Sequence, residues 1–220
     1  MLQIGGFALG TIAEIEAATR ALRATLKPAD YGALGSYAKA MRNGGTVMAA
    51  GLGAAAPIFS FRYGGANLCQ IRRIKMSAAA GVTAFAAGSA MFDFFVARAF
   101  TASDTGGVAG SVAGNYAKLK SAMAASSGVA DFRISQTATL TAVTRTLDAD
   151  PFASLIGGVP VVAGQSLIPP NTAVFNPAPG EDLLTLAQNE GFVCQATVPA
   201  TGVWNFSIAV EWGEYVAVVP

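Results

Sequence analysis

The strongest structural signal in this sequence is a period-two pattern of apolar residues in EGFVCQATVPATGVWNFSIAVEWGEY, residues 190–215, with strict alternation over nine residues. The alternation stops at the turn PATG (199–202) and resumes with two tryptophans on one side of the pattern. A period of two residues is typical of a β-strand that buries one of its faces. The stretch therefore predicts an antiparallel hairpin whose aromatic side faces a core.

Three further segments carry the same period. PIFSFRY (57–63) and NLCQIRRIKMS (67–77) predict a second hairpin across GGAN. The apolar phase of the latter slips between Ile71 and Ile74, as a β-bulge would make it. DFRIS (131–135) predicts another short strand.

The aromatic segment AMFDFFVARAF (90–100) fits a strand or a helix by spacing alone. Its aromatic content and the turn residues on both sides favour a strand. Apolar residues on both faces, with Phe100 on the side of Phe92, predict cover from a second sheet and from a loop or neighbouring subunit. The predicted core residues are Phe92, Phe94, Phe192, Trp204, Phe206, Ile208 and Trp212.

Most of the remaining sequence predicts loops. NYAKLKSAMAAS (115–126) is the best helix candidate, whereas alternation over 19–27 favours a strand. The prolines of LIPPNTAVFNPAPGED (167–182) argue against a regular strand there. We expect an extended N-terminal arm over 1–18 and a single domain over 19–220. The predicted fold is all-β, an antiparallel β-sandwich of jelly-roll type with long Gly/Ala/Pro-rich loops and at most one or two short helices.

Composition suggests a membrane protein at first, because 53% of the residues are hydrophobic. The long uncharged stretches are interrupted by Gly, Pro and Ser, however, and none offers about 20 strongly apolar residues. The first 20 residues lack a basic segment followed by an apolar run, so no secretory signal is expected. A net charge of +1 gives no overall attraction for nucleic acid. We predict neither membrane nor nucleic-acid binding.

Catalytic chemistry finds little support in the sequence. The chain has no histidine, which removes Ser-His-Asp and Cys-His catalysis and most zinc sites. DTGG (104–107) is interpreted as a turn. The neighbouring carboxylates are expected to be solvated loop residues: Glu14 and Glu16, Asp148 and Asp150, Glu181 and Asp182. We therefore predict no enzyme, and no catalytic, cofactor-binding or metal-binding residues.

Two other features have more than one interpretation. Cys69 and Cys194 are expected to be small buried apolar residues, with a disulfide between them as the alternative. The basic residues Arg72, Arg73 and Lys75 predict a solvated sheet edge or a subunit contact, and a phosphate-binding face is the alternative.

Four segments in chain order resemble a group of structural proteins of tailed bacteriophages: RALRATLKPADYGALGSYAKA (20–40), MFDFFVARAFTASDTGG (91–107), LAQNEGFV (186–193) and ATVPATGVWNFSIAVEWGEY (196–215). These are packing and turn motifs, and the similarity covers most of the chain. The resemblance implies a component of the virion, assembled in the host cytoplasm. It carries over no functional residues.

Three hypotheses follow from these observations. The first is a capsid cement or decoration protein, a trimer that binds the major capsid protein and stabilises the assembled shell. The second is a tail, baseplate or fibre component. The third is a glycan-binding jelly roll that would use exposed aromatic residues, for which Tyr31, Tyr37, Phe175 and Tyr215 are the candidates.

Overall fold

The computed structural model describes residues 14–15, 22–23, 33–43, 48–49, 52, 55–111, 117–126, 131–158, 162–178 and 181–215. The chain divides into two units, Met1–Tyr31 and Gly32–Pro220. In the first unit the described residues form β1 (Glu14–Ile15) and β2 (Leu22–Arg23), which pair antiparallel. β2 falls within the predicted strand 19–27. The expected boundary between residues 18 and 19 lies outside the described residues.

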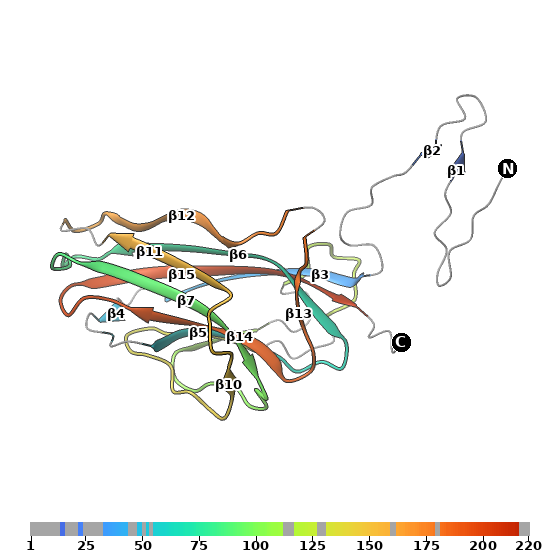
Figure 1. Ribbon diagram of the computed structural model, residues 1–220, viewed down its shortest axis with the longest axis horizontal. Helices are drawn as coiled ribbons and strands as arrows, with labels where there is room; N and C mark the ends of the chain where they lie inside the picture. The colour runs from blue at the N-terminus through green and yellow to red at the C-terminus, as the bar shows by residue number, and fades with distance from the viewer. Residues whose placement is uncertain are drawn as a thin grey trace. The chain divides into compact units, whose positions relative to one another are not determined.

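The second unit is a β-sandwich of two antiparallel sheets, and its described residues contain no helix (Figure 1). The seven-stranded sheet comprises β5 (Ala56–Tyr63), β7 (Ser89–Arg98), β8 (Val108–Gly110), β9 (Asp131–Ile134), β10 (Thr146–Leu147), β11 (Ala153–Gly158) and β14 (Glu190–Thr197). The six-stranded sheet comprises β3 (Ala33–Arg42), β4 (Met48–Ala49), β6 (Leu68–Ala80), β12 (Ser166–Phe175), β13 (Leu184–Leu186) and β15 (Val203–Tyr215).

Each sheet has its own strand order. The seven-stranded sheet runs β10-β7-β14-β5-β9-β8, and β11 also pairs with β7. The six-stranded sheet runs β12-β6-β15-β3, with β13 on β6 and β4 on β15. Strands of six or more residues are β3, β5, β6, β7, β11, β12, β14 and β15. Neither sheet contains two of these that are consecutive along the chain, except β7 and β11 in the seven-stranded sheet.

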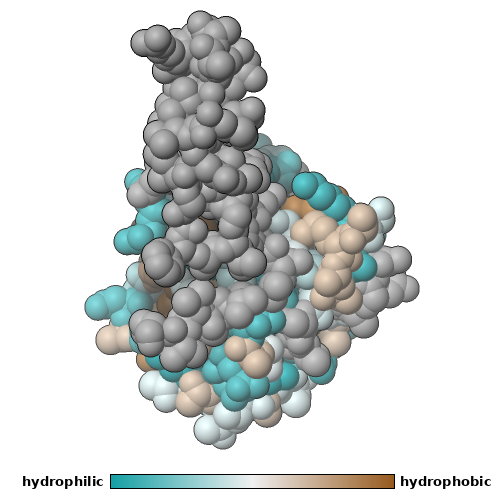
Figure 2. Space-filling model, turned by 90° about the vertical axis from the view of Figure 1, so that its right-hand side faces the viewer, coloured by the Kyte–Doolittle hydropathy of each residue, from teal (hydrophilic) through white to brown (hydrophobic). Residues whose placement is uncertain are grey.

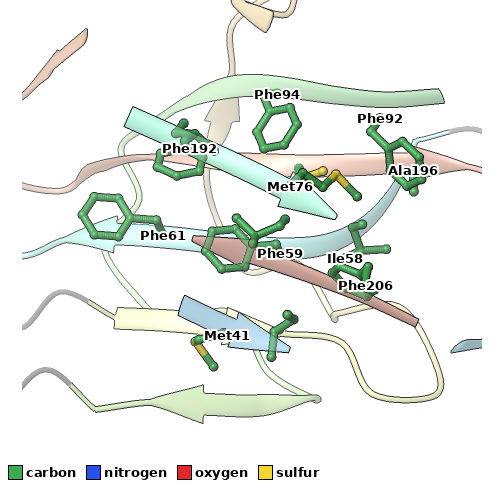
Figure 3. Packing of buried hydrophobic residues seen from close by; sticks show 14 of the residues in the cluster. Met41, Ile58, Phe59, Phe61, Met76, Phe92, Phe94, Phe192, Ala196 and Phe206 are labelled. Atoms are coloured by element: carbon green, nitrogen blue, oxygen red, sulfur yellow. The ribbon is translucent and has the colours of Figure 1, made fainter. Parts of the chain in front are cut away.

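Aromatic residues fill the space between the sheets (Figure 3). Phe61 of β5 and Phe132 of β9 both contact Trp212 of β15, with ring centroids 5.9 and 5.4 Å apart. Phe92 of β7 lies 5.6 Å from Trp204. All of the residues we placed in the core are buried there: Phe92, Phe94, Phe192, Trp204, Phe206, Ile208 and Trp212.

The strands of both predicted hairpins exist, but their predicted pairing is wrong. β14 lies between β5 and β7, whereas β15 lies in the other sheet between β6 and β3. β5 and β6 are separated in the same way. The turns PATG and GGAN therefore carry the chain from one sheet to the other. Two strands that face each other across a sandwich bury the same side as two strands of a hairpin, so alternation cannot distinguish them.

Three local predictions are confirmed. Most of residues 90–100 belong to strand β7, and residues 131–135 contain β9. The bulge in β6 is also present, because Glu211 of β15 pairs with Arg73 while the next residue, Trp212, pairs with Ile71. Arg72 is the extra residue of this bulge.

Two other local predictions are wrong. The described part of the helix candidate, residues 117–126, contains turns and a bridge between Lys118 and Tyr37 instead of a helix. Its backbone bonds to β3, where the amide of Ala38 donates to the carbonyl of Ala117 at 2.8 Å. A short helix is marginal by itself, and the edge of β3 offers these groups alternative partners.

The proline-rich segment 167–182 was expected to lack a regular strand, yet it contains most of β12. Its register on β6 shifts between Ile168 and Thr172, where Pro169, Pro170 and Asn171 lie. Asn171 has a φ of 58°. β12 is an edge strand of its sheet, and prolines are tolerated at bulges of edge strands because they need not donate to a neighbour.

Candidate interaction surfaces

Part of the outer face of the seven-stranded sheet, around Ala97, is covered by loops and by β10, whereas Met91 and Ile156 on the same face are exposed. Ala97, Phe100 and Val193 are buried there as a second, smaller cluster, against which Val143 and Leu147 pack. Phe100 was expected on the inner side with Phe92, but Ala99 has a φ of 51° and the chain turns before it. The predicted cover on both sides of 90–100 is therefore supplied near Ala97 by this chain's own loops.

A buried ion pair lies within this loop cover. Asp104 has no exposed surface, and its Oδ1 accepts hydrogen bonds from Arg145 and, at 3.2 Å, from the amide of Val143. The Arg145 guanidinium lies 5.1 Å from the centre of the Phe100 ring. The sequence did not predict this pair, because DTGG was interpreted as a turn and the partner of Asp104 is 41 residues away.

A second charged group lies on β9. Arg133 and Asp131 are 3.7 Å apart, and both are largely buried. Burial raises the pKa of Asp131, Arg133 and Arg62 oppose that rise, and Asp104 adds to it. The carboxylates of Asp104 and Asp131 are thus both paired with arginine side chains. Such buried pairs are typical of contacts that hold a fold together, and we assign neither carboxylate a role in proton transfer.

The outer face of the six-stranded sheet has a different character. Its side chains alternate with those of the core, and none of those named here is buried. We call this surface the small-residue face; it consists of Ala38, Ala40, Arg42, Arg73, Lys75, Ser77, Ala79, Asn205, Ser207, Ala209 and Glu211. No cluster of buried hydrophobic residues covers it among the described residues.

The three basic residues singled out from the sequence have different environments. Arg72 lies against Gly213 and donates hydrogen bonds to Ser36 Oγ at 2.9 Å and to the hydroxyl of Tyr215 at 2.8 Å. Arg73 forms a half-exposed ion pair with Glu211 at 2.6 Å. Lys75 lies next to Ala209 in the sheet and forms no ion pair with a described residue.

A shallow groove of about 480 Å³ crosses one end of the small-residue face. Ser77 and Ala79 of β6 and Ser207 of β15 form its floor. Arg42, at the end of β3, borders one side, and Pro170 of the bulged edge strand β12 borders the other. None of the described residues that line the groove is acidic.

Of the aromatic residues considered for glycan binding, the three that the structure describes are engaged within the chain. Tyr37 is buried, stacks on Trp212 at 5.4 Å and donates to the carbonyl of Ala124. Phe175 packs on Phe152, Tyr215 is bonded to Arg72, and Tyr31 lies outside the described residues. The large exposed apolar side chains of the described residues are all aliphatic: Val82, Met91, Val108, Leu119, Ile156 and Val162.

In the view of Figure 2, hydrophilic and hydrophobic residues are mixed over the described surface. Of the carboxylates expected in solvated loops, Asp150, Glu181 and Asp182 are exposed, and Asp148 pairs with Arg98 at 3.0 Å. Glu14 and Glu16 have no described side chain.

Cys69 and Cys194 are both free thiols and both buried, one in each sheet. Burial raises the pKa of each, and Glu214 adds to the effect at Cys69 while Asp93 adds to it at Cys194. A buried thiol of raised pKa is a poor nucleophile and a poor metal ligand.

Within the described ranges, no three His, Cys, Asp or Glu residues are grouped so that they could hold a metal ion. No helix in the described part of the chain has the length and apolar character needed to span a bilayer. Comparison with protein-family models, curated proteins and solved structures found no match.

Proposed function

We propose that this chain is a structural component of a tailed-phage virion, and more specifically a cement or decoration protein of the capsid. It binds the assembled shell of the major capsid protein and stabilises it. The single observation that carries an assembly role is the small-residue face. Six of its eleven residues are alanine or serine, whose short side chains let another protein approach closely and lose little freedom on contact.

We also infer jelly-roll connectivity from the strand order. Numbering the eight long strands in chain order gives 1-8-3-6 across one sheet and 2-7-4-5 across the other. This is the order of two Greek keys wrapped into a sandwich, an architecture common among viral capsid and lectin domains. The fold class alone carries no function, so it supports the proposal only together with the surface and the resemblance.

The mechanism we propose is mechanical. A protein that contacts several shell subunits at once adds binding energy that exists only in the assembled shell, and it thereby shifts the equilibrium towards assembly. We propose self-association as a trimer at these contacts. Catalysis has no part in this function, and neither a cofactor, a nucleic acid nor a membrane is involved.

The test is the copy number of this chain in purified particles of the phage that encodes it, measured by quantitative mass spectrometry against the major capsid protein. A fixed ratio to the capsid protein, equivalent to shell-wide occupancy, would support the cement role. A few copies per particle would favour the tail, baseplate or fibre alternative. Absence from particles would contradict a virion role altogether.

A screen against a glycan array tests the remaining alternative, a glycan-binding function. Because Tyr37, Phe175 and Tyr215 are engaged within the chain, we expect no glycan to bind. Binding of one glycan class with low micromolar affinity would favour the lectin-like hypothesis over the structural one.

A further inference from the structure

We propose that the groove on the small-residue face binds an extended acidic segment of the partner protein, with Arg42 pairing with a carboxylate. The inference rests on the proposed function, because it identifies the contact through which the chain would hold the capsid shell. Its occupant follows from the charge, the shape and the floor of the groove.

The charge of the face is positive where the groove lies. The Arg42 side chain is exposed and forms no hydrogen bond or ion pair with another described residue, and Lys75 forms no ion pair with one. Glu211 is the one acidic residue of the small-residue face, and Arg73 already neutralises it. The face therefore offers two cations without acidic partners among the described residues, and a binding partner with carboxylates would complement them.

The spacing of these cations suits a chain rather than a single ion. Arg42 lies opposite Ser207 on β15, which lies opposite Ser77 on β6. Lys75 is two residues from Ser77 along the same face of β6. At about 4.8 Å between strands and about 3.4 Å per residue, the two cations are on the order of 10–12 Å apart along the sheet surface. Acidic residues on the same side of an extended segment, two or four positions apart, are about 7 or about 14 Å apart, which brackets this distance.

The floor of the groove admits a polypeptide backbone. Ser77, Ala79 and Ser207 project only short side chains, and Asn205 adds an amide that can donate and accept. On the β12 side the groove is bordered by the segment 169–171, where the register of β12 shifts. The backbone amide of Asn171 donates to Ser77 Oγ at 2.8 Å and holds this segment against β6. A segment lying in the groove would thus be bounded on both sides and positioned by side-chain hydrogen bonds.

The first experiment measures binding of a fluorescein-labelled hexaglutamate peptide to the full chain by fluorescence anisotropy at low ionic strength. We expect weak, salt-sensitive binding. Arg42→Glu should weaken it by about tenfold or more, because the substitution replaces attraction by repulsion. Lys120→Glu is the matched control, since Lys120 is exposed outside the small-residue face and the charge change is the same. It should alter binding by less than about twofold.

Two results would overturn the proposal: an equal effect of Arg42→Glu and Lys120→Glu, or equally tight binding of a labelled hexalysine peptide. Arg42→Gln keeps the result interpretable if charge reversal perturbs folding, and melting temperatures of all variants check this directly. Loss of binding in Arg42→Gln with an unchanged melting temperature supports the site.

The second experiment adds each variant to particles that lack the chain and measures its occupancy after sedimentation. If the wild-type chain decorates particles and Arg42→Glu decorates them equally well, the groove is not the contact, although the proposed function stands. If the wild-type chain never binds particles but hexaglutamate binding depends on Arg42, the proposed function fails and the groove serves another acidic protein. Loss of decoration in Arg42→Glu alone supports both.

Discussion

The two outer faces of this sandwich differ in what lies on top of them. On the seven-stranded sheet, loops bury Ala97, Phe100 and Val193 and enclose the pair of Asp104 and Arg145. On the six-stranded sheet, none of the residues of the small-residue face is buried, its alanines included. The chain thus covers part of one face with its own loops, whereas no cluster of buried hydrophobic residues covers the other among the described residues. The covered part contributes to folding, and the small-residue face is where we propose that a partner binds.

Substituting the same residue type on the two faces should give the largest contrast. Ala97→Lys places an ammonium group where no surface is exposed, which we expect to cost about 4–5 kcal/mol or more and to unfold a domain of ordinary stability. Ala40→Lys, on the small-residue face, should change the free energy of unfolding by less than about 0.5 kcal/mol. Urea titration followed by tryptophan fluorescence measures both. Similar losses in the two variants would mean that the faces do not differ in burial.

Removing one partner of the buried ion pair should be nearly as damaging. Arg145→Ala leaves the Asp104 carboxylate buried without its cation, at a cost of about 3–5 kcal/mol in unfolding free energy. The double variant Asp104→Leu with Arg145→Met is the control, since replacing both charges by apolar groups should recover most of the loss. If Arg145→Ala melts at the wild-type temperature, the loop cover does not depend on this pair.

Arg72 should be the one strongly structural cation on the other sheet. Its guanidinium joins β6 to Ser36 of β3 and Tyr215 of β15, so Arg72→Ala should cost about 1.5–3 kcal/mol. The neighbouring half-exposed pair predicts less than about 1 kcal/mol for Arg73→Ala. If chemical denaturation shows equal losses of unfolding free energy in Arg72→Ala and Arg73→Ala, Arg72 does not have this structural role.

A smaller, pH-dependent difference is expected at Asp131. Burial raises its pKa above the ordinary value despite Arg133 and Arg62. A carboxyl whose pKa is higher in the folded chain than in the unfolded chain stabilises the fold below its unfolded pKa, and that contribution is lost as the pH rises through the folded pKa. Asp131→Asn lacks this loss. The melting temperature of the wild type should therefore fall relative to Asp131→Asn as the pH rises through this interval, and a difference independent of pH would contradict the argument.

The sequence predicts the strands of this fold better than their partners. Aromatic content with flanking turn residues located the strand containing Phe92, and alternation located the strands containing Phe192 and Trp204 because each buries one side against the same core. It misassigned their pairing, since burial against a facing sheet and burial within a hairpin give the same period. β12 was missed because Pro169 and Pro170 read as a break, and only its place at a sheet edge makes them acceptable.

The surfaces were less predictable than the core. The cluster Arg72, Arg73 and Lys75 was identifiable from the sequence, but the bulge directs Arg72 to partners 36 and 143 residues away. Arg42 and the groove gave no signal of their own, because the groove forms where β3, β6, β12 and β15 meet. The same holds for Asp104 and Arg145, which only the folded loops bring together.

The two buried thiols provide each sheet with its own reporter. Cys69 lies in the six-stranded sheet and Cys194 in the seven-stranded sheet, and burial raises the pKa of both, so neither reacts while its strand stays in place. Single Cys→Ser variants would let alkylation rates follow the opening of one sheet at a time. A partner that binds the small-residue face would then slow the labelling of Cys69 more than that of Cys194. The ratio of the two labelling rates would therefore show which sheet the partner binds.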